Sequence, residues 1–435
     1  MKKILSLLLV LGLSLSMAAC GNSNSDKDSQ GGGTTDKTET INLTVWCPEA
    51  DHEFAKKVEE KYKQANPDKK YKFFYGIQGE NDAATKVLND VTNAPDVFSF
   101  ASDQINKLIS GDALARIGGS YLENIKNSNS KDAVDSATVS LNGEDCTYAM
   151  PYTDNTFFLY YDKRVLTEAD VASLDTIIAK SVAKNKVFAM PLNDGWYNSS
   201  FYFAENLGYN VTYDNALGES SITCDFDSEV GQAVTAALWD YVKNPGVKAD
   251  ADDSKILAGF QDGSIAAAVT GIWNKNSIQE YLGANMGVAK LPTYTINRGT
   301  ANEKQNQLVS FAGYKLMGVS NYSKNKAEAM KFAQFYTSEE MQLLHYQYRG
   351  FVPTNTKAKA NAALADDACA AAITAQLAYS KPQKSVPSTL WTPMQGVGDS
   401  MISKATNSEE YSFEEIAELI ASAVAQIETV PGAAA

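Results

Sequence analysis

Strand and helix patterns alternate over residues 41–108, and this alternation constrains the fold more than any other feature. Residues 41–46 alternate apolar and polar side chains, and strand-like runs recur at residues 71–75 and 96–100. Helical patterns follow each of them: from Asp51, a candidate cap, to the residue before Pro67, and over residues 82–91 and 103–108. Strands that alternate with helices at this spacing predict an α/β fold with a parallel sheet covered on both faces.

Further elements are predicted in the rest of the chain. The continuous apolar run of residues 157–161 predicts a buried strand. The sequences at residues 337–340 and 412–415 both read as capping boxes that open helices. Helical spacing predicts two buried stripes, one of Ala327, Met330, Ala333 and Phe335, the other of Phe413, Ile416, Ile420, Val424 and Ile427.

The first forty residues predict export. Lys2 and Lys3 precede an apolar run from Ile4 to Leu15, which is too short to span a bilayer, and small residues then lead to Cys20. We expect residues 1–19 to be a signal peptide. Cys20 resembles the diacylated cysteine of a bacterial lipobox, although Met17 stands where Leu is usual; the alternative is an ordinary signal peptide with a chance cysteine. Residues 20–40 are then the lipidated cysteine and a flexible tether, because almost nothing there is apolar. The protein is expected at the outer face of the cytoplasmic membrane, anchored through Cys20.

Composition limits the possible partners. About 395 residues remain after the tether, enough for two domains or one large one. The net charge of −14 argues against nucleic acid, and an anionic ligand would need a local basic pocket. Four cysteines are far apart, which argues against a zinc site and favours buried free thiols, although three disulfide pairings stay open: Cys47, Cys146, Cys224 and Cys369.

No catalytic motif stands out. The two histidines, His52 and His345, have no partnering motif, and the sequence lacks the zinc-protease, nucleophile-elbow, phosphate-loop and dinucleotide signatures. The acidic run of Asp250, Asp252 and Asp253 lacks the glycine that a calcium loop needs, and we interpret it as a solvated turn. A glycosidase needs two facing carboxylates, and nothing singles out such a pair among 52 acidic residues. We therefore expect no catalytic residue, no metal and no cofactor.

Several motifs carry a family resemblance. Phe260-x-x-Gly263-x-x-Ala266 runs on to Gly271-x-Trp273, and residues 151–168 include Leu-Tyr-Tyr-Asp. Together with Val45-Trp46, Asp96-Val97 and residues 287–292 and 350–353, their order resembles the family-one extracellular solute-binding proteins, whose type member is the maltose-binding protein. The resemblance covers nearly all of residues 41–429.

The resemblance implies a two-lobed, type II periplasmic-binding-protein-like fold that closes on a ligand. Lobe 1 would comprise residues 41–154 and 308–357, and lobe 2 residues 155–307 and 358–435. The chain would cross between the lobes near residues 152–157, 307–311 and 355–360.

The resemblance also implies a sugar site. Aromatic planes complement the apolar face of a pyranose, and carboxylates and amides accept hydrogen bonds from its hydroxyls. The expected stacking residues are Trp196, Tyr197, Trp273, Trp391 and Phe100, for which core packing is the alternative. The expected polar contacts are Glu49, Asp51, Asp103, Asp154, Asn155, Asp194 and Arg349, for which a surface or capping role is the alternative. Gln104 stands where maltose binders often have Arg, and Asn155 where they have an acid. Trp46 and Trp239 are expected in the core.

The implied function is that of a binding lipoprotein of an ATP-driven importer. It would capture malto-oligosaccharides or related neutral oligosaccharides as a monomer and deliver them to the transmembrane permease. Two alternatives stay open: the same fold with a disaccharide, a β-linked or plant-derived oligosaccharide or a polyol as ligand, and a surface glycoside hydrolase or lyase.

Overall fold

The computed structural model describes residues 39–431. The expected signal peptide, Cys20 and the tether up to residue 38 lie outside the described residues. Within the described range, no helix is long and apolar enough to cross a membrane.

The first sheet contains the strands that the sequence predicts near the beginning of the chain. Its order is β17-β16-β3-β1-β2, and β6 also pairs with β16. β1 is parallel to β2 and β3, as predicted, but β16 is antiparallel to β3 and β6. The prediction of a parallel sheet is therefore wrong for this half, because distant segments of the chain complete a mixed sheet. The strands are β1 (Thr40–Cys47), β2 (Lys70–Ile77), β3 (Val97–Ala101), β6 (Ala149–Asn155), β16 (Ser310–Val319) and β17 (Ser380–Pro382).

The second sheet has the order β11-β8-β12-β7-β13. β8 is parallel to β11 and β12, whereas β7 is antiparallel to β12 and β13. The strands are β7 (Phe157–Asp162), β8 (Val187–Ala189), β11 (Val247–Lys248), β12 (Ile265–Gly271) and β13 (Met286–Ala289).

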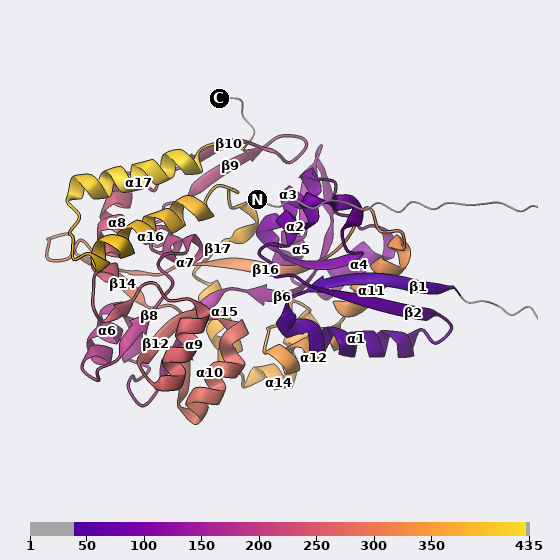
Figure 1. Ribbon diagram of the computed structural model, residues 1–435, viewed down its shortest axis with the longest axis horizontal. Helices are drawn as coiled ribbons and strands as arrows, with labels where there is room; N and C mark the ends of the chain where they lie inside the picture. The colour runs from indigo at the N-terminus through magenta and orange to yellow at the C-terminus, as the bar shows by residue number, and fades with distance from the viewer. Residues whose placement is uncertain (1–38, 432–435) are drawn as a thin grey trace, which may run out of the picture. The chain divides into compact units, whose positions relative to one another are not determined.

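Two strands of the first sheet lead directly to elements of the second half. β6 ends at Asn155 and β7 begins at Phe157, so that Thr156 alone separates strands of different sheets. β16 begins at Ser310, and the hydroxyls of Thr156 and Ser310 lie 2.9 Å apart. β6 and β16 run side by side between the two groups of elements in Figure 1. The chain therefore passes directly from the first sheet to the second at Thr156, and the beginning of β16 lies beside this point.

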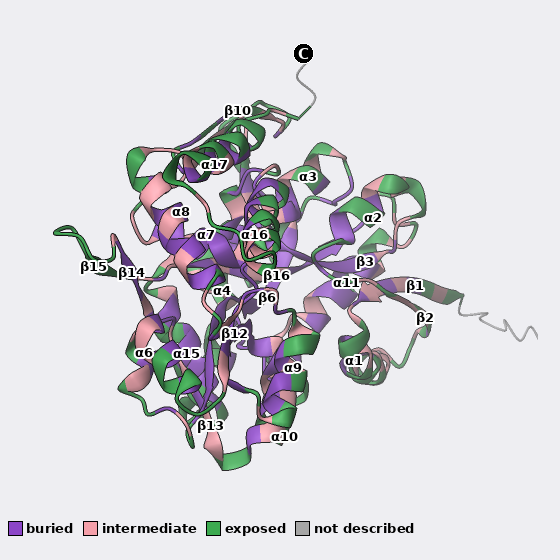
Figure 2. Ribbon diagram, turned by 60° about the vertical axis from the view of Figure 1, so that its left-hand side comes forward, coloured by how far each residue is buried: buried purple, intermediate pink, exposed green. Residues whose placement is uncertain are grey.

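Both sheets are covered on both faces, as predicted. Alternate residues of a strand point to opposite faces, and in β7 Leu159 packs into one apolar cluster while Phe158 and Tyr160 pack into another. In the first sheet, Val45 and Phe98 likewise belong to different clusters. Figure 2 shows the resulting burial along β3, β6, β16 and β12.

Helices form the covering layers. Those that follow strands of the first sheet are α1 (His52–Ala65), α2 (Ala83–Asn89), α3 (Ile105–Ser110), α4 (Gly119–Ser128), α5 (Lys131–Ser136), α11 (Lys326–Tyr336) and α12 (Glu339–Arg349). The others are α6 (Leu174–Val182), α7 (Gly195–Phe203), α8 (Glu229–Val242), α9 (Asp253–Asp262), α10 (Lys275–Leu282), α13 (Thr356–Lys359), α14 (Ala362–Ala365), α15 (Ala368–Leu377), α16 (Trp391–Thr406) and α17 (Phe413–Ile427). Three hairpins complete the described part of the chain: β4 (Thr138–Leu141) with β5 (Glu144–Thr147), β9 (Tyr209–Tyr213) with β10 (Glu219–Cys224), and β14 (Thr293–Ile296) with β15 (Lys304–Gln307).

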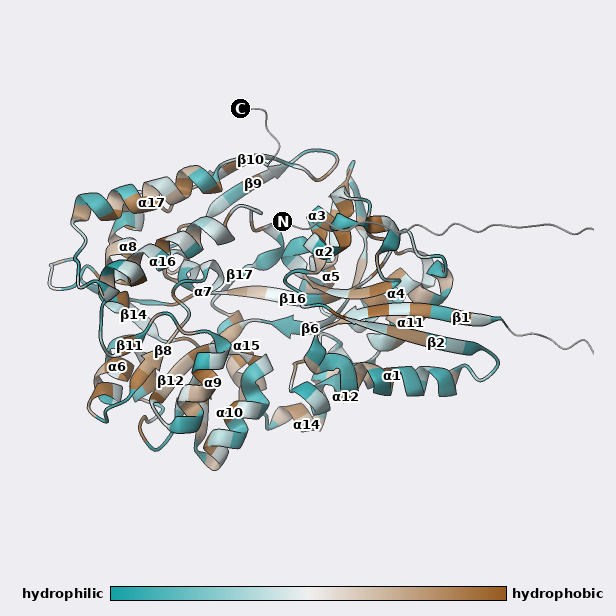
Figure 3. Ribbon diagram, viewed as in Figure 1, coloured by the Kyte–Doolittle hydropathy of each residue, from teal (hydrophilic) through white to brown (hydrophobic). Residues whose placement is uncertain are grey.

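The buried face of a helix agrees with the prediction where its apolar residues recur at regular helical spacing. α1 is largely hydrophilic in Figure 3, and it buries Phe54, Val58 and Tyr62 as predicted. The stripe predicted for α11 is partly wrong, because Ala327 is exposed while Met330 and Ala333 are buried. In α17 the predicted face is buried except for Phe413, which is 61% exposed.

The four cysteines outside the signal region are buried free thiols, as the sequence favours. Trp239 is a core residue at 3% exposure, and Trp46 packs partly buried over Gly76. Both tryptophans therefore have the structural role predicted for them.

Candidate functional site

Two of the predicted stacking tryptophans lie together. Trp196 is in the first turn of α7, and Trp273 is in a short 3-10 helix (Ile272–Asn274) that follows β12. Both side chains are partly exposed, and their ring centroids lie 5.9 Å apart with planes tilted by 37°. Phe157 packs edge-on against Trp196 at 4.7 Å. The two indoles therefore form one partly exposed aromatic surface.

The Trp273 ring is fixed from both sides. It lies over Gly271, where a Cβ atom would come within 1.9 Å of the ring. Its Nε1 donates a hydrogen bond of 2.8 Å to Asp253 Oδ2. The other oxygen of Asp253 accepts from Thr270 Oγ1 at 2.9 Å and from Asn274 Nδ2 at 2.6 Å. The sequence interpretation of Asp253 as part of a solvated turn is therefore wrong.

Asp194 shapes the beginning of α7. It is the N-cap, and its Oδ1 accepts a 2.8 Å hydrogen bond from the backbone N–H of Trp196. Partial desolvation raises the pKa of the Asp194 carboxyl, and the negative charge of Asp253 adds to this rise. The carboxylate is thereby positioned beside the tryptophan pair.

Asp103 approaches from the other sheet. It lies in a 3-10 helix (Ser102–Gln104) directly after β3, and its Oδ1 accepts a hydrogen bond of 3.0 Å from Gln383 Nε2. The same Gln383 accepts through Oε1 from Trp196 Nε1 at 3.2 Å. Burial raises the pKa of the Asp103 carboxyl, while Gln383 and Trp391 oppose the rise. A glutamine that the sequence did not single out thus links residues from both halves.

Trp391 opens α16 close to this group. Its ring contacts Phe311 edge-on at 5.2 Å and remains partly exposed. Its carbonyl oxygen lies 2.8 Å from the place that a Cβ atom of Gly195 would occupy, so α7 and α16 approach closely there. The structure therefore brings together Trp196, Trp273, Trp391, Asp103 and Asp194.

Two predicted stacking residues are core residues in this structure. Phe100 has no exposed surface and packs with Phe98 at 5.8 Å and with Leu316. Tyr197 is 5% exposed and packs on Phe157 at 4.7 Å. Strand alternation explains Phe100, because it shares the inward face of β3 with Phe98.

Asp51, one of the predicted polar contacts, pairs with other side chains of the protein. Asp51 is 2% exposed and lies 2.9 Å from Arg349 Nε and 3.5 Å from His345 Nε2. Asp51 therefore forms a buried ion pair in place of the predicted ligand contact and helix cap, and its side chain makes no cap hydrogen bond. Although burial alone would raise the pKa of Asp51, the neighbouring His345, Lys315 and Arg349 side chains lower it to about 2.

The remaining predicted polar contacts either follow β1 or lie at the end of β6. Asp154 is 4% exposed and pairs with Lys359 at 2.7 Å, and burial nevertheless raises the pKa of its carboxyl. Asn155 is buried, and its backbone pairs with Gly313. Glu49 is exposed after β1.

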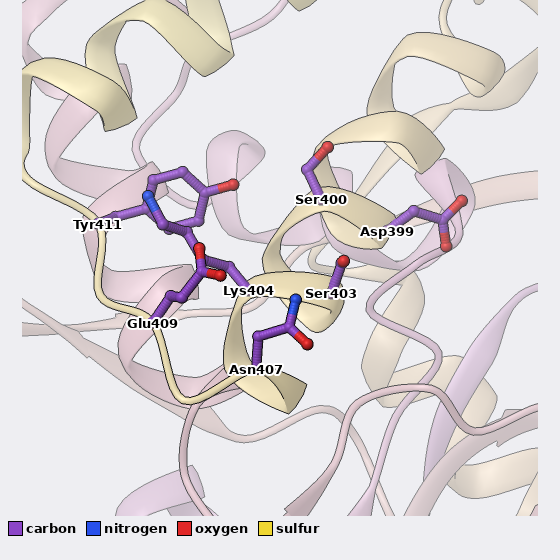
Figure 4. Close-up of a pocket in the computed structure, with 7 residues that line it drawn as sticks. All are labelled: Asp399, Ser400, Ser403, Lys404, Asn407, Glu409 and Tyr411. Carbon is purple, nitrogen blue, oxygen red and sulfur yellow. The ribbon is translucent and has the colours of Figure 1, made fainter.

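A separate hollow of about 540 Å³ lies at the end of α16 and is drawn in Figure 4. Its single aromatic ring, Tyr411, is covered by Lys404 Nζ at 4.0 Å from the ring centroid, and this amine also lies 2.7 Å from Glu415. The lining residues are Asp399, Ser400, Ser403, Lys404, Asn407, Glu409 and Tyr411. With no free aromatic face, this hollow differs from the tryptophan site.

Comparisons with known proteins agree with the fold. The family model for a bacterial extracellular solute-binding protein matches residues 57–372. A maltooligosaccharide ABC transporter solute-binding lipoprotein of Streptococcus pneumoniae strain R6 is 25% identical over 390 residues, covering 84% of this chain and 86% of the relative. The galactooligosaccharide-binding protein of Bacillus subtilis strain 168 is 25% identical over 309 residues, covering 69% and 70%.

A solved structure described as containing acarbose is 34% identical, has a TM-score of 0.75 and covers 90% of this chain and 99% of its own. The likeness confirms the two-lobed periplasmic-binding-protein fold. Since the family model spans well over half of the chain, this protein belongs to the family of bacterial extracellular solute-binding proteins.

Proposed function

We propose that this protein captures malto-oligosaccharides, short α-1,4-glucans, and delivers them to the membrane permease of an ABC importer. The observation that carries the proposal is the partly exposed pair of Trp196 and Trp273, flanked by the carboxylates of Asp103 and Asp194. Indole faces complement the apolar faces of glucose rings, and carboxylates accept hydrogen bonds from the hydroxyls. The names of the relatives add support, because one is named as the solute-binding lipoprotein of a maltooligosaccharide ABC transporter and a 34% identical structure is described with acarbose.

Capture works through hinge closure. The ligand favours the closed form because both lobes contact it only there. We assign residues 41–154 and 308–357 to lobe 1 and residues 155–307 and 358–435 to lobe 2. Support comes from the strands, since β6 and β16 belong to one sheet and β7 and β12 to the other, with β17 as the exception because it lies within the lobe 2 range and pairs with β16.

The anchor is proposed at Cys20, on the outer face of the cytoplasmic membrane. The lipobox-like sequence supports it, and so do relatives named as lipoproteins. Cys20→Ser is expected to move the protein from the membrane fraction to the medium, and unchanged membrane retention would contradict the anchor.

Titration calorimetry of the monomeric protein against a panel of sugars tests the ligand. We expect binding of maltotriose and longer α-glucans, and weaker or no binding of galacto-oligosaccharides and polyols. No heat with any α-glucan of two to seven units would contradict the assignment. Galacto-oligosaccharide is the second candidate, because a relative carries that name.

Variants locate the site. Trp273→Ala and Trp391→Ala should each weaken α-glucan binding about tenfold or more, about 1.4 kcal/mol, if the rings stack on the sugar. Phe413→Ala is the control, since Phe413 is an exposed aromatic ring far along the chain in α17.

The protein is proposed to bind without catalysis. Incubation with malto-oligosaccharide should yield no new product by chromatography. Turnover would instead favour a surface glycoside hydrolase.

A further inference from the structure

Gln383 lies on a segment that joins the two halves. It opens a 3-10 helix (Gln383–Ser385) after β17, whose Pro382 pairs with Ala312 of β16 in the first sheet. The flanking helices α15 and α16 pack instead in the clusters around the second sheet. Segment 380–386 therefore returns to the first sheet. This return is additional to the crossings that the family resemblance implies.

The two partners of Gln383 have opposite hydrogen-bonding needs. The indole of Trp196 can only donate, whereas an ionised Asp103 can only accept. The amide oxygen of Gln383 accepts from Trp196 Nε1 at 3.2 Å, and its amide nitrogen donates to Asp103 Oδ1 at 3.0 Å. A neutral amide can therefore make both hydrogen bonds at the same time. The two partners also determine which end of the amide is the oxygen.

The surroundings hold this amide in place. Gln383 is 5% exposed, and a Cβ atom at Gly313 would come within 2.3 Å of its Oε1. The neighbouring Lys384 donates to the backbone carbonyls of Asp135, at 2.7 Å, and Thr138. The segment is thus fastened to the first half next to the site.

We propose that Gln383 is a positioning residue that holds the Trp196 ring and the Asp103 carboxylate in one arrangement, so that residues of both lobes meet the same saccharide. This inference rests on the proposed function. A neutral side chain with both an acceptor and a donor is required at this position.

Gln383→Glu tests the requirement, because a protonated glutamic acid can replace the amide and an ionised one cannot. At pH 7.5 the new carboxylate faces Asp103, and we expect maltotriose affinity to fall about tenfold or more. As the pH is lowered to 5, the pair takes up a proton and the affinity should recover towards that of the wild type. Gln383→Leu should lose affinity without recovery.

The measurement is calorimetry of the full chain from pH 5 to 8, with thermal unfolding at each pH to monitor folding. Asp103, Asp194, Tyr209 and Lys384 are titratable groups near the bridge. Dividing by the wild-type affinity at each pH removes their own contribution. Gln347→Glu, at an exposed position of α12, introduces the same charge elsewhere and should leave the ratio near one.

The outcomes separate the two proposals. If the wild-type protein binds no saccharide, the proposed function fails. If the wild type binds and Gln383→Glu keeps full affinity at every pH, the inference is overturned. A loss of affinity that does not recover at low pH would also overturn it, since that result would indicate only a structural disturbance.

Discussion

Gly271 shows how a residue without a side chain can define a binding surface. The Trp273 ring occupies the space above Gly271, and Asp253 holds the ring's N–H. A ring fixed in this way loses little conformational freedom when a sugar stacks on it. If Trp273 stacks on the sugar as proposed, the glycine contributes to ligand affinity through the orientation of its neighbour.

Gly271→Ala is expected to weaken α-glucan binding about tenfold, because the new methyl group must displace the Trp273 ring, which now lies 1.9 Å from that position. Calorimetry measures the effect. Gly396→Ala is a matched control, since no atom lies within 4 Å of a Cβ atom there. Equal affinity in both variants would show that the ring tilt is irrelevant to binding.

Asp51 should make stability depend on pH. Its pKa is about 2 in the folded protein, against 3.8 as the ordinary value, so the folded state favours the ionised form. The contribution of about 2 kcal/mol is fully present above about pH 4 and is lost as the pH falls towards 2. Asp51→Asn should lower the free energy of unfolding at pH 5 by about this amount and flatten its dependence on pH between 4 and 2.

Urea denaturation at several pH values measures this. Asp366→Asn, at an exposed aspartate, is the control for removal of one charge. If both variants lose the same stability, the Asp51 ion pair contributes nothing specific.

The site could be predicted only in part from single residues. Trp196, Trp273 and Asp194 are expected in the site from the family resemblance, and the structure brings them together. Gln383 carries no local signal: its hydrogen bond to Asp103 joins positions 280 apart, and no local pattern encodes such a pair. Phe100 is a core residue because both faces of β3 are covered, and the sequence of this strand alone does not show that.

At the scale of elements, the two predicted capping boxes behave differently. In α17, Ser412 Oγ accepts from the Glu415 N–H, and the Glu415 side chain accepts from the Ser412 N–H. At the start of α12, Ser338 occupies the N-cap position but its side chain makes no cap hydrogen bond. The same motif therefore has two outcomes, and tertiary surroundings decide between them.

Ser412→Ala should lower the free energy of unfolding by about 1 kcal/mol, the usual contribution of an N-cap side chain. Ser338→Ala is the matched variant and should change it by much less, since no cap bond is lost. Chemical denaturation compares them. A larger loss for Ser338→Ala would mean that its hydroxyl caps α12 in solution.

Elements with strict apolar spacing were the ones that could be predicted. The strands β1, β2 and β3 and helix α1 follow directly from the sequence. The stripe of α11 was partly misread because alanine fits either face, so the position of Ala327 was not determined by its own chemistry. The antiparallel β16 could not be placed, since its pairing with β3 joins distant segments.

At the scale of the whole molecule, the arrangement of two sheets around one site couples ligand binding to folding. Asp103 follows a strand of the first sheet and Trp196 lies on a helix that packs on the second, and Gln383 connects them. A ligand that contacts both residues stabilises only the arrangement in which both halves are folded and closed. Unfolding of either half then releases the ligand.

Saturating maltotriose is therefore expected to raise the unfolding temperature of both halves together. At a free concentration of about 100 times Kd, linkage adds about 2.7 kcal/mol to the free energy of unfolding. Differential scanning calorimetry should show one transition that moves upward with sugar, and the shift should be reduced in Trp273→Ala. If the sugar moved only one of two separate transitions, the ligand would be held by a single lobe. Because closure requires contacts from both lobes, that result would also exclude the hinge mechanism.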